Sequence, residues 1–214
     1  MSPRRLLPAA LFAALLLPAA AADAKAPSCT RDGFSLEQAS GKVRIVTKTL
    51  KTNGVNETRR EAVSACWTGT GKRFRIATER DFGDDLRSST RVEIVDERYV
   101  GIVETGEGGV SIGVTAAIFD ARKAKRLHTS TNRCAADDDD FRGPDDAVFL
   151  PKGGMAFTCG PLWLFRNAAQ KTATQLEPPA AGPRSLALAH GSDSFIDRLY
   201  WTLGDGTIRS LDLS

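Results

Sequence analysis

A serine inside the pattern Gly109-Val110-Ser111-Ile112-Gly113 is the closest approach of this sequence to a catalytic signature. In many serine hydrolases a G-x-S-x-G pattern places the nucleophile on a sharp turn between a strand and a helix, and its acid and histidine partners follow in the chain. Asp120, His128 and His190 do follow Ser111. The segment before Gly109, however, lacks the alternating strands and helices that would build such a site. We therefore expect Ser111 to be a strand residue, with a Ser111-type secreted hydrolase (an esterase) as the alternative.

Metal chemistry has two sets of candidate ligands. His128 and His190 have no cysteine or carboxylate at ligand spacing, which disfavours a zinc site. The run Asp137–Asp146 is the densest charge cluster, and Ca²⁺ prefers several carboxylates on one flexible loop. The weak candidate calcium ligands in this run are Asp138, Asp140 and Asp145. The spacing of an EF-hand is absent, so we expect a solvated acidic loop, at most weak Ca²⁺ binding and no other cofactor.

An apolar leader indicates export. Arg4 and Arg5 precede the apolar run 6–21, and Ala22-Asp23-Ala24 supplies a small-x-small cleavage pattern. No second apolar run of about 18 residues follows, so the sequence predicts no transmembrane segment. We read residues 1–24 as a signal peptide and residues 25–214 as one domain that is secreted or held in the cell envelope.

The four cysteines of the chain lie in the exported part: Cys29, Cys66, Cys134 and Cys159. An even number of cysteines in an exported chain indicates disulfides, and four cysteines allow three pairings. We favour Cys29–Cys66 and Cys134–Cys159, because cysteines close in sequence meet most often in a fold of local hairpins. Lipidation of Cys29 is disfavoured, because the cysteine does not directly follow the apolar run.

The charge balance of the exported part is nearly even. The whole chain has 29 Lys and Arg against 26 Asp and Glu, and removing the leader leaves 27 against 25. Such a small excess disfavours nucleic-acid binding, which needs a concentrated basic face.

Patterns typical of strands dominate the exported part. Arg73–Ala77 alternates strictly between polar and apolar residues, as a half-buried strand does. Asp205-Gly206 between two such patterns predicts a tight hairpin. Alternation places Leu199, Trp201 and Leu203 on one face, so we expect Trp201 to be buried and Arg209 and Asp212 to be exposed. The other expected strands are Val43–Thr47, Val92–Val95, Tyr99–Thr105, Val110–Phe119, Ala147–Leu150, Met155–Cys159, Leu162–Phe165 and Leu186–Ala189.

Two segments also fit a helix. Ala116–Leu127 is rich in alanine, but its apolar stripe is narrow, so we favour a strand, a turn at 121–124 and a return strand at Lys125–Thr129. Ala168–Leu176 poses the same choice.

The strands repeat along the chain. Trp67, Ile102, Phe157 and Trp201 each centre a strand-like run, and their mean spacing is about 45 residues, within the period of a four-stranded propeller blade. We therefore expect an all-β, antiparallel fold of propeller-like repeats, either about four blades or a partial propeller. A β-sandwich or barrel is the alternative.

The last hairpin resembles a YWTD-type β-propeller repeat. The tetrad region is Tyr200-Trp201-Thr202-Leu203, and Ile208 and Leu213 match the spacing of the following strand. Leu203 replaces the aspartate of the tetrad. The exported part as a whole is similar to uncharacterised exported bacterial proteins with β-propeller-like (YWTD/WD40-like) repeats, through RYVGIVE, FDARKAKRL and the closing LYWT and RSLDL runs. The resemblance implies propeller-like repeats and no particular activity.

These patterns favour a non-catalytic exported β-repeat protein that acts as a macromolecular binding or interaction module. Its expected partner is an unknown protein or a cell-envelope polymer, without nucleic acid. Carbohydrate binding on Trp67, Trp163 or Trp201 is a further alternative, and it needs those rings to be exposed.

Overall fold

The computed structural model describes residues 28–52, 57–81, 87–107, 113–131, 133–134, 146–190 and 197–213. Ser111, residues 1–24, which we expect to be a signal peptide, and the acidic-loop residues Asp138, Asp140 and Asp145 lie outside these ranges. Within them the expected all-β class is confirmed, since the regular elements are antiparallel strands and two short 3-10 turns, η1 (Pro151–Gly153) and η2 (Pro179–Ala181). No helix in the described ranges is long and apolar enough to cross a membrane.

The described strands form hydrogen-bonded antiparallel sheets of eight, four and three strands, and the eight-stranded sheet folds at its middle into two halves. We number the two halves and the two smaller sheets as the first to fourth sheets, each a meander in chain order. The first sheet contains β1 (Ser35–Ser40), β2 (Val43–Thr49), β3 (Arg59–Trp67) and β4 (Lys72–Asp81). The second contains β5 (Arg87–Val95), β6 (Tyr99–Glu107), β7 (Gly113–Asp120) and β8 (Lys125–Thr129). The third contains β9 (Asp146–Leu150), β10 (Gly154–Thr158), β11 (Leu162–Phe165) and β12 (Thr174–Glu177). The fourth contains β13 (Arg184–Ala189), β14 (Arg198–Thr202) and β15 (Ile208–Asp212).

The first two sheets are joined at a corner between β4 and β5. These strands share one backbone ladder pair, Asp81 with Arg87, and then diverge. Side chains replace the missing backbone bonds beyond that pair. The Arg80 amide donates to the Ser88 hydroxyl (2.6 Å), and the Thr90 amide donates to the Glu79 carboxylate (2.9 Å). The corner therefore lets one continuous ladder fold into two sheets that face each other.

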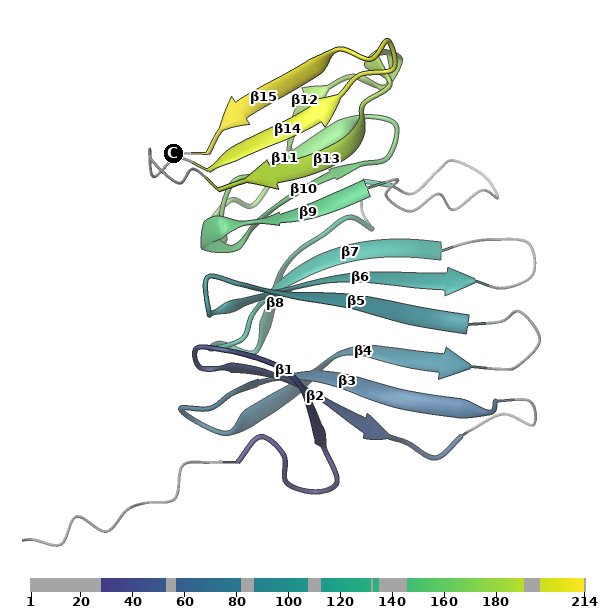
Figure 1. Cartoon of the computed structure of the whole chain (residues 1–214), viewed down its shortest axis with the longest axis vertical. Helices are drawn as coiled ribbons and strands as arrows, with labels where there is room; N and C mark the ends of the chain where they lie inside the picture. The colour runs from purple at the N-terminus through teal and green to yellow at the C-terminus, as the bar shows by residue number, and fades with distance from the viewer. Residues whose placement is uncertain are drawn as a thin grey trace, which may run out of the picture.

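The four sheets lie one after another along the long axis of the molecule, with apolar layers between neighbouring sheets (Figure 1). The first layer joins Val43, Ile45, Val63 and Ala65 to Val100, Ile102, Ala117 and Phe119. The second joins Tyr99, Ala116 and Ile118 to Phe149, Met155, Phe157 and Phe165. The third joins Leu150, Ala156, Leu162 and Leu164 to Leu186, Leu199, Trp201 and Leu203. The two middle sheets are thus buried on both faces, which explains their continuous apolar runs.

The all-β, antiparallel class is confirmed, but the expected propeller-like repeat is not. Ile102, Phe157 and Trp201 lie on the second strands of their sheets, β6, β10 and β14, whereas Trp67 lies on β3, the third strand of the first sheet. The proposed equivalence of Trp67 with the other three is therefore wrong by one strand. The stack is also open across the described residues, because the described core layers join only consecutive sheets and none joins the first sheet to the fourth. Closure into a propeller is not observed.

Several local predictions are confirmed. Ala116–Leu127 forms the end of β7, a turn and β8 rather than a helix. β14 and β15 form the predicted hairpin, with Gly206 at φ +86° in its turn. Ala168–Leu176 forms turns followed by β12. Both favoured disulfides are present, Cys29–Cys66 and Cys134–Cys159.

Candidate functional site

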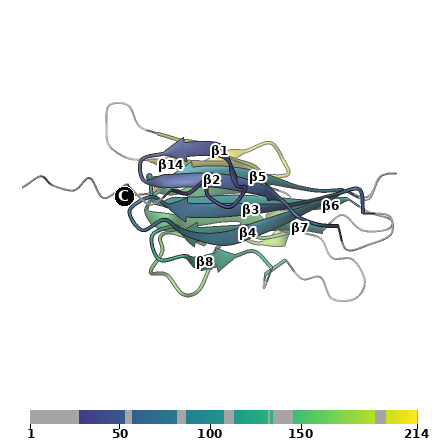
Figure 2. The same cartoon turned by 90° about the horizontal axis from the view of Figure 1, so that it is seen from below.

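The first sheet lies at one end of the stack, and Figure 2 views the molecule from that end. Its outer face collects basic side chains. Residues paired across an antiparallel ladder point to the same side of the sheet, so the register identifies the face. The outward rows across β2, β3 and β4 are Arg44–Cys66–Arg73, then Val46–Ser64–Arg75, then Lys48–Ala62–Thr78, with Arg60–Arg80 beyond them. Six cations thus share one face, which we call the basic face: Arg44, Lys48, Arg60, Arg73, Arg75 and Arg80.

A β-bulge on β4 is required for this arrangement. Simple alternation would place Arg80 on the face opposite to Arg73 and Arg75. The register shifts between Val63 and Ser64, so that Ser64 pairs with Arg75 while Val63 pairs with Ala77, and Ile76 is the extra residue. The extra residue reverses the alternation beyond it and brings Arg80 to the basic face.

Along β3 the basic face has a floor of small side chains. Cys66, Ser64 and Ala62 are all buried there, while longer side chains rise from β2 and β4 on either side. The result is a groove of about 300 Å³ that runs over β3. We call it the basic groove, and it is lined by Phe34, Lys48, Leu50, Ala62, Ser64, Arg73, Phe74 and Arg75.

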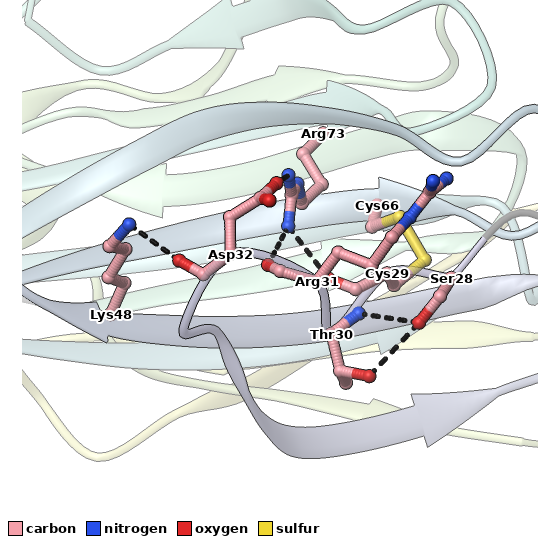
Figure 3. Close-up of polar contacts among 8 residues, drawn as sticks. All are labelled: Ser28, Cys29, Thr30, Arg31, Asp32, Lys48, Cys66 and Arg73. Carbon is pink, nitrogen blue, oxygen red and sulfur yellow. Dashed lines mark hydrogen bonds and ion pairs between the residues drawn. A yellow bond between two sulfur atoms is a disulfide. The ribbon is translucent and has the colours of Figure 1, made fainter.

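One end of the basic groove is closed by the segment 28–34, which the Cys29–Cys66 disulfide ties to β3 (Figure 3). Arg73 donates through Nη1 to the carbonyl oxygens of Arg31 (2.5 Å) and Cys29 (3.3 Å), and through Nη2 to the Asp32 carboxylate (2.5 Å). Lys48 Nζ donates to the Asp32 carbonyl oxygen (2.5 Å). The hydrogen bond and charge of Arg73, with the charges of Arg31 and Lys48, outweigh desolvation and lower the pKa of Asp32.

Phe34 lies beneath these two cations. The Arg73 guanidinium lies 4.3 Å from the centroid of the Phe34 ring, and Lys48 Nζ lies 5.4 Å from it, both within cation–π range. Phe34 in turn packs against Cys29, Val46 and Cys66. The segment therefore holds Arg73 and Lys48 in place while leaving the groove open beside them.

Two cations of the basic face have no side-chain partner in the described part of the chain. Arg75 is exposed and lines the groove. Arg60 is half-buried, and its Nε is fully buried without a hydrogen-bond acceptor. By contrast, Arg44 donates to the carbonyls of Gly41 and Val43, and Arg80 lies 4.0 Å from the Glu57 carboxylate. Arg75 is thus an exposed donor left for an external anion, and Arg60 adds a charge on the same face that no described side chain pairs with.

A second, polar pocket of about 220 Å³ lies between the first two sheets. Its carboxylates are already engaged: Glu79 accepts from the Thr90 amide, Glu61 pairs with Arg59, and Glu37 accepts from the Thr47 hydroxyl (2.8 Å). No pair of unengaged carboxylates is available there for acid–base chemistry. In the described ranges no group of three or more His, Cys, Asp or Glu could hold a metal ion.

The two histidines lie apart from each other and from the basic groove. His128 is buried between the second and third sheets, where it stacks on Phe165 at 4.1 Å and donates through Nε2 to the Asn167 carbonyl (2.9 Å). Burial lowers the pKa of His128, and the Asn167 carbonyl only partly offsets this. His190 is exposed and contacts Asp197.

The tryptophans do not form an exposed platform. Trp201 is buried, as expected, and its Nε1 donates to the Glu177 carboxylate (3.1 Å), which also accepts from Arg209 (2.7 Å). Arg209 and Asp212 are exposed, also as expected. Trp67 and Trp163 are half-buried against the first and second apolar layers.

Comparison with protein-family models, curated proteins and solved structures finds no match for this chain.

Proposed function

We propose that this chain is a non-catalytic exported binding module, built on a propeller-like stack of sheets, that docks an anionic macromolecule on its basic face. The observation that carries the proposal is the gathering of six cations on one side of three strands, with Arg60 and Arg75 left without side-chain partners among the described residues. An anion placed there gains charge-assisted hydrogen bonds that the folded chain does not satisfy internally.

An exported location fits this function. The two disulfides suit an oxidising compartment, and the leader supplies a route to it. In the cell envelope or outside the cell, the available anionic macromolecules are acidic proteins and envelope polymers rather than nucleic acid.

The proposal is tested by measuring the binding of fluorescent polyglutamate and dextran sulfate to the disulfide-bonded protein at low and high salt. An Arg60→Gln/Arg75→Gln variant should lose at least tenfold in affinity, because neither guanidinium has an internal role in the described structure. A matched Lys125→Gln/Arg126→Gln variant removes the same charge from β8 and should bind as the wild type does. Binding should weaken as salt rises, since exposed charges are screened over about 10 Å at 0.1 M. Equal binding by both variants would refute docking on this face.

A further inference from the structure

We infer that the occupant of the basic groove is a segment of polypeptide in which acidic residues alternate with large apolar ones. This inference rests on the proposed function and specifies which anionic partner uses the face. Three features of the groove support it: its lining, the spacing of its arginines and the contacts that segment 28–34 makes with Arg73 and Lys48.

The lining of the basic groove is divided between cations and apolar side chains. Lys48, Arg73 and Arg75 supply the charge, while Phe34 and Leu50 supply apolar and aromatic surface. A uniformly hydrated polymer of sulfate or phosphate groups would satisfy the cations and leave the apolar lining against water. A peptide that carries both carboxylates and apolar side chains matches both parts of the lining.

The spacing of the cations suits an extended chain. Arg73 and Arg75 are two positions apart on β4 and point to the same side. Same-face residues of a strand repeat about every 6.6 Å, and alternate residues of an extended peptide have the same repeat. The Asp32 carboxylate already occupies Arg73, so a carboxylate of a bound extended peptide can occupy Arg75 one repeat further along. The small side chains of Ala62 and Ser64 leave room for that peptide over β3.

The segment 28–34 demonstrates the polar half of this recognition within the molecule. Arg73 binds one carboxylate, from Asp32, together with the main-chain carbonyls of Cys29 and Arg31, and Lys48 binds a third carbonyl. These are the groups that an acidic peptide offers and that a polysaccharide sulfate does not. Arg75 lies on the same strand, one same-face position further along, and has no such partner among the described residues. An external peptide would continue from the point where the internal segment ends.

The test uses three fluorescent peptides with the disulfide-bonded full exported chain. The first alternates Glu with Leu and Phe over eight residues, the second replaces each Glu by Gln, and the third replaces each Leu and Phe by Ser. We expect the first peptide to bind at least tenfold more tightly than either of the others, as measured by fluorescence anisotropy. Dextran sulfate is the competing probe.

Three variants locate the site. Arg75→Glu should weaken binding of the first peptide at least tenfold, whereas Arg126→Glu, which reverses an exposed charge on β8, should leave it unchanged. Leu50→Ser should remove most of the preference for the first peptide over the third. The melting curves of Arg75→Glu and Arg126→Glu should overlay that of the wild type, because both residues are exposed, and Leu50→Ser should stay folded with a small loss of stability, because Leu50 is half-buried.

The outcomes separate this inference from the proposed function. Binding of dextran sulfate through Arg75, with no binding of the first peptide, would overturn the inference and leave the proposed function standing. Equal binding of the first and third peptides would overturn the apolar half of the inference. Failure of every probe to bind would overturn both.

Discussion

Gly101 is the residue on which the approach of the second and third sheets depends. A Cβ atom at this position would lie 2.2 Å from the ring of Phe149, which is fully buried on β9. We therefore expect Gly101→Ala to lower the free energy of unfolding by about 1–3 kcal/mol through overpacking. Urea unfolding of the variant measures the loss.

A double-mutant cycle checks the cause. Phe149→Leu removes part of the ring that Gly101 accommodates, so the Gly101→Ala/Phe149→Leu protein should be more stable than the two single losses predict. Strict additivity would show that Gly101→Ala acts through the strand backbone instead of through Phe149.

His128 makes the stability of the protein depend on pH. Burial lowers its pKa below the ordinary value of 6.5, so the unfolded chain takes up a proton at a higher pH than the folded one. The stabilisation from the neutral imidazole is complete above about pH 6.5 and is lost as pH falls through the lower, folded pKa. We expect the free energy of unfolding to fall between pH 7 and pH 5.

The control is His128→Phe, which retains an aromatic ring against Phe165 but does not titrate. Its free energy of unfolding should change less between pH 7 and pH 5 than that of the wild type. The same pH dependence in both proteins would assign the effect to other groups.

Trp201 combines apolar burial with a polar contact to the third sheet. We expect Trp201→Ala to cost about 3–5 kcal/mol of unfolding free energy, because the ring fills the third apolar layer. Trp201→Phe should cost less, since it loses the hydrogen bond to Glu177 but Arg209 still pairs with that carboxylate. A melting temperature of Trp201→Ala close to that of the wild type would show that the last hairpin is peripheral to the fold.

At the scale of the elements, the Cys29–Cys66 disulfide ties the segment 28–34 to β3. The closed loop spans 37 residues, for which chain entropy gives a stabilisation of about 4 kcal/mol. The Cys29→Ser/Cys66→Ser variant should lose stability of that order and should release Arg73 from its carbonyl partners. Calorimetry measures the first effect, and non-reducing peptide mapping of the wild type verifies the pairing. A disulfide-linked peptide that joins Cys66 to Cys134 would contradict the Cys29–Cys66 pairing and the stabilisation expected from it.

The sequence predicts individual elements better than their arrangement. Arg73–Ala77 and the Asp205-Gly206 hairpin were predictable because alternation and turn chemistry are local properties. The basic face was not predictable from the sequence, because it depends on which strands pair and on the bulge at Ile76. Strand pairing and the position of a bulge are not properties of one segment. The near-neutral charge balance concealed it as well, since a sum over the chain carries no information about faces.

The predicted position of Trp67 within the repeat was wrong for a related reason. We aligned Trp67 with Ile102, Phe157 and Trp201 because it is an aromatic residue in a strand. The strand of the first sheet that is equivalent to theirs is β2, whose central residues include Ile45 and Val46. Burial on a sheet face requires apolar volume and does not require an aromatic ring. The spacing of aromatic residues alone therefore cannot identify which strands of successive sheets are equivalent.

At the scale of the whole molecule, each described apolar layer joins only one sheet to the next. The strands of the middle sheets are buried on both faces, as in β10, whereas β1 and β15 are largely exposed. We expect amide hydrogen exchange to be slowest in β6, β7, β10 and β11 and fastest in β1 and β15. Uniform protection across the four sheets would contradict a stack that is stable only through neighbouring layers.

The corner between β4 and β5 determines how the molecule responds to mechanical tension. In the proposed function, a partner bound to the basic face would pull on the first sheet, and the chain would transmit that force to the remaining sheets through β4 and β5. At the corner, this force is resisted by one backbone ladder pair and by the hydrogen bonds of the Ser88 and Glu79 side chains. These interactions open one at a time rather than together. Tension between the first sheet and the rest of the molecule would therefore open the corner bond by bond, with the first apolar layer as the remaining contact between the two sheets.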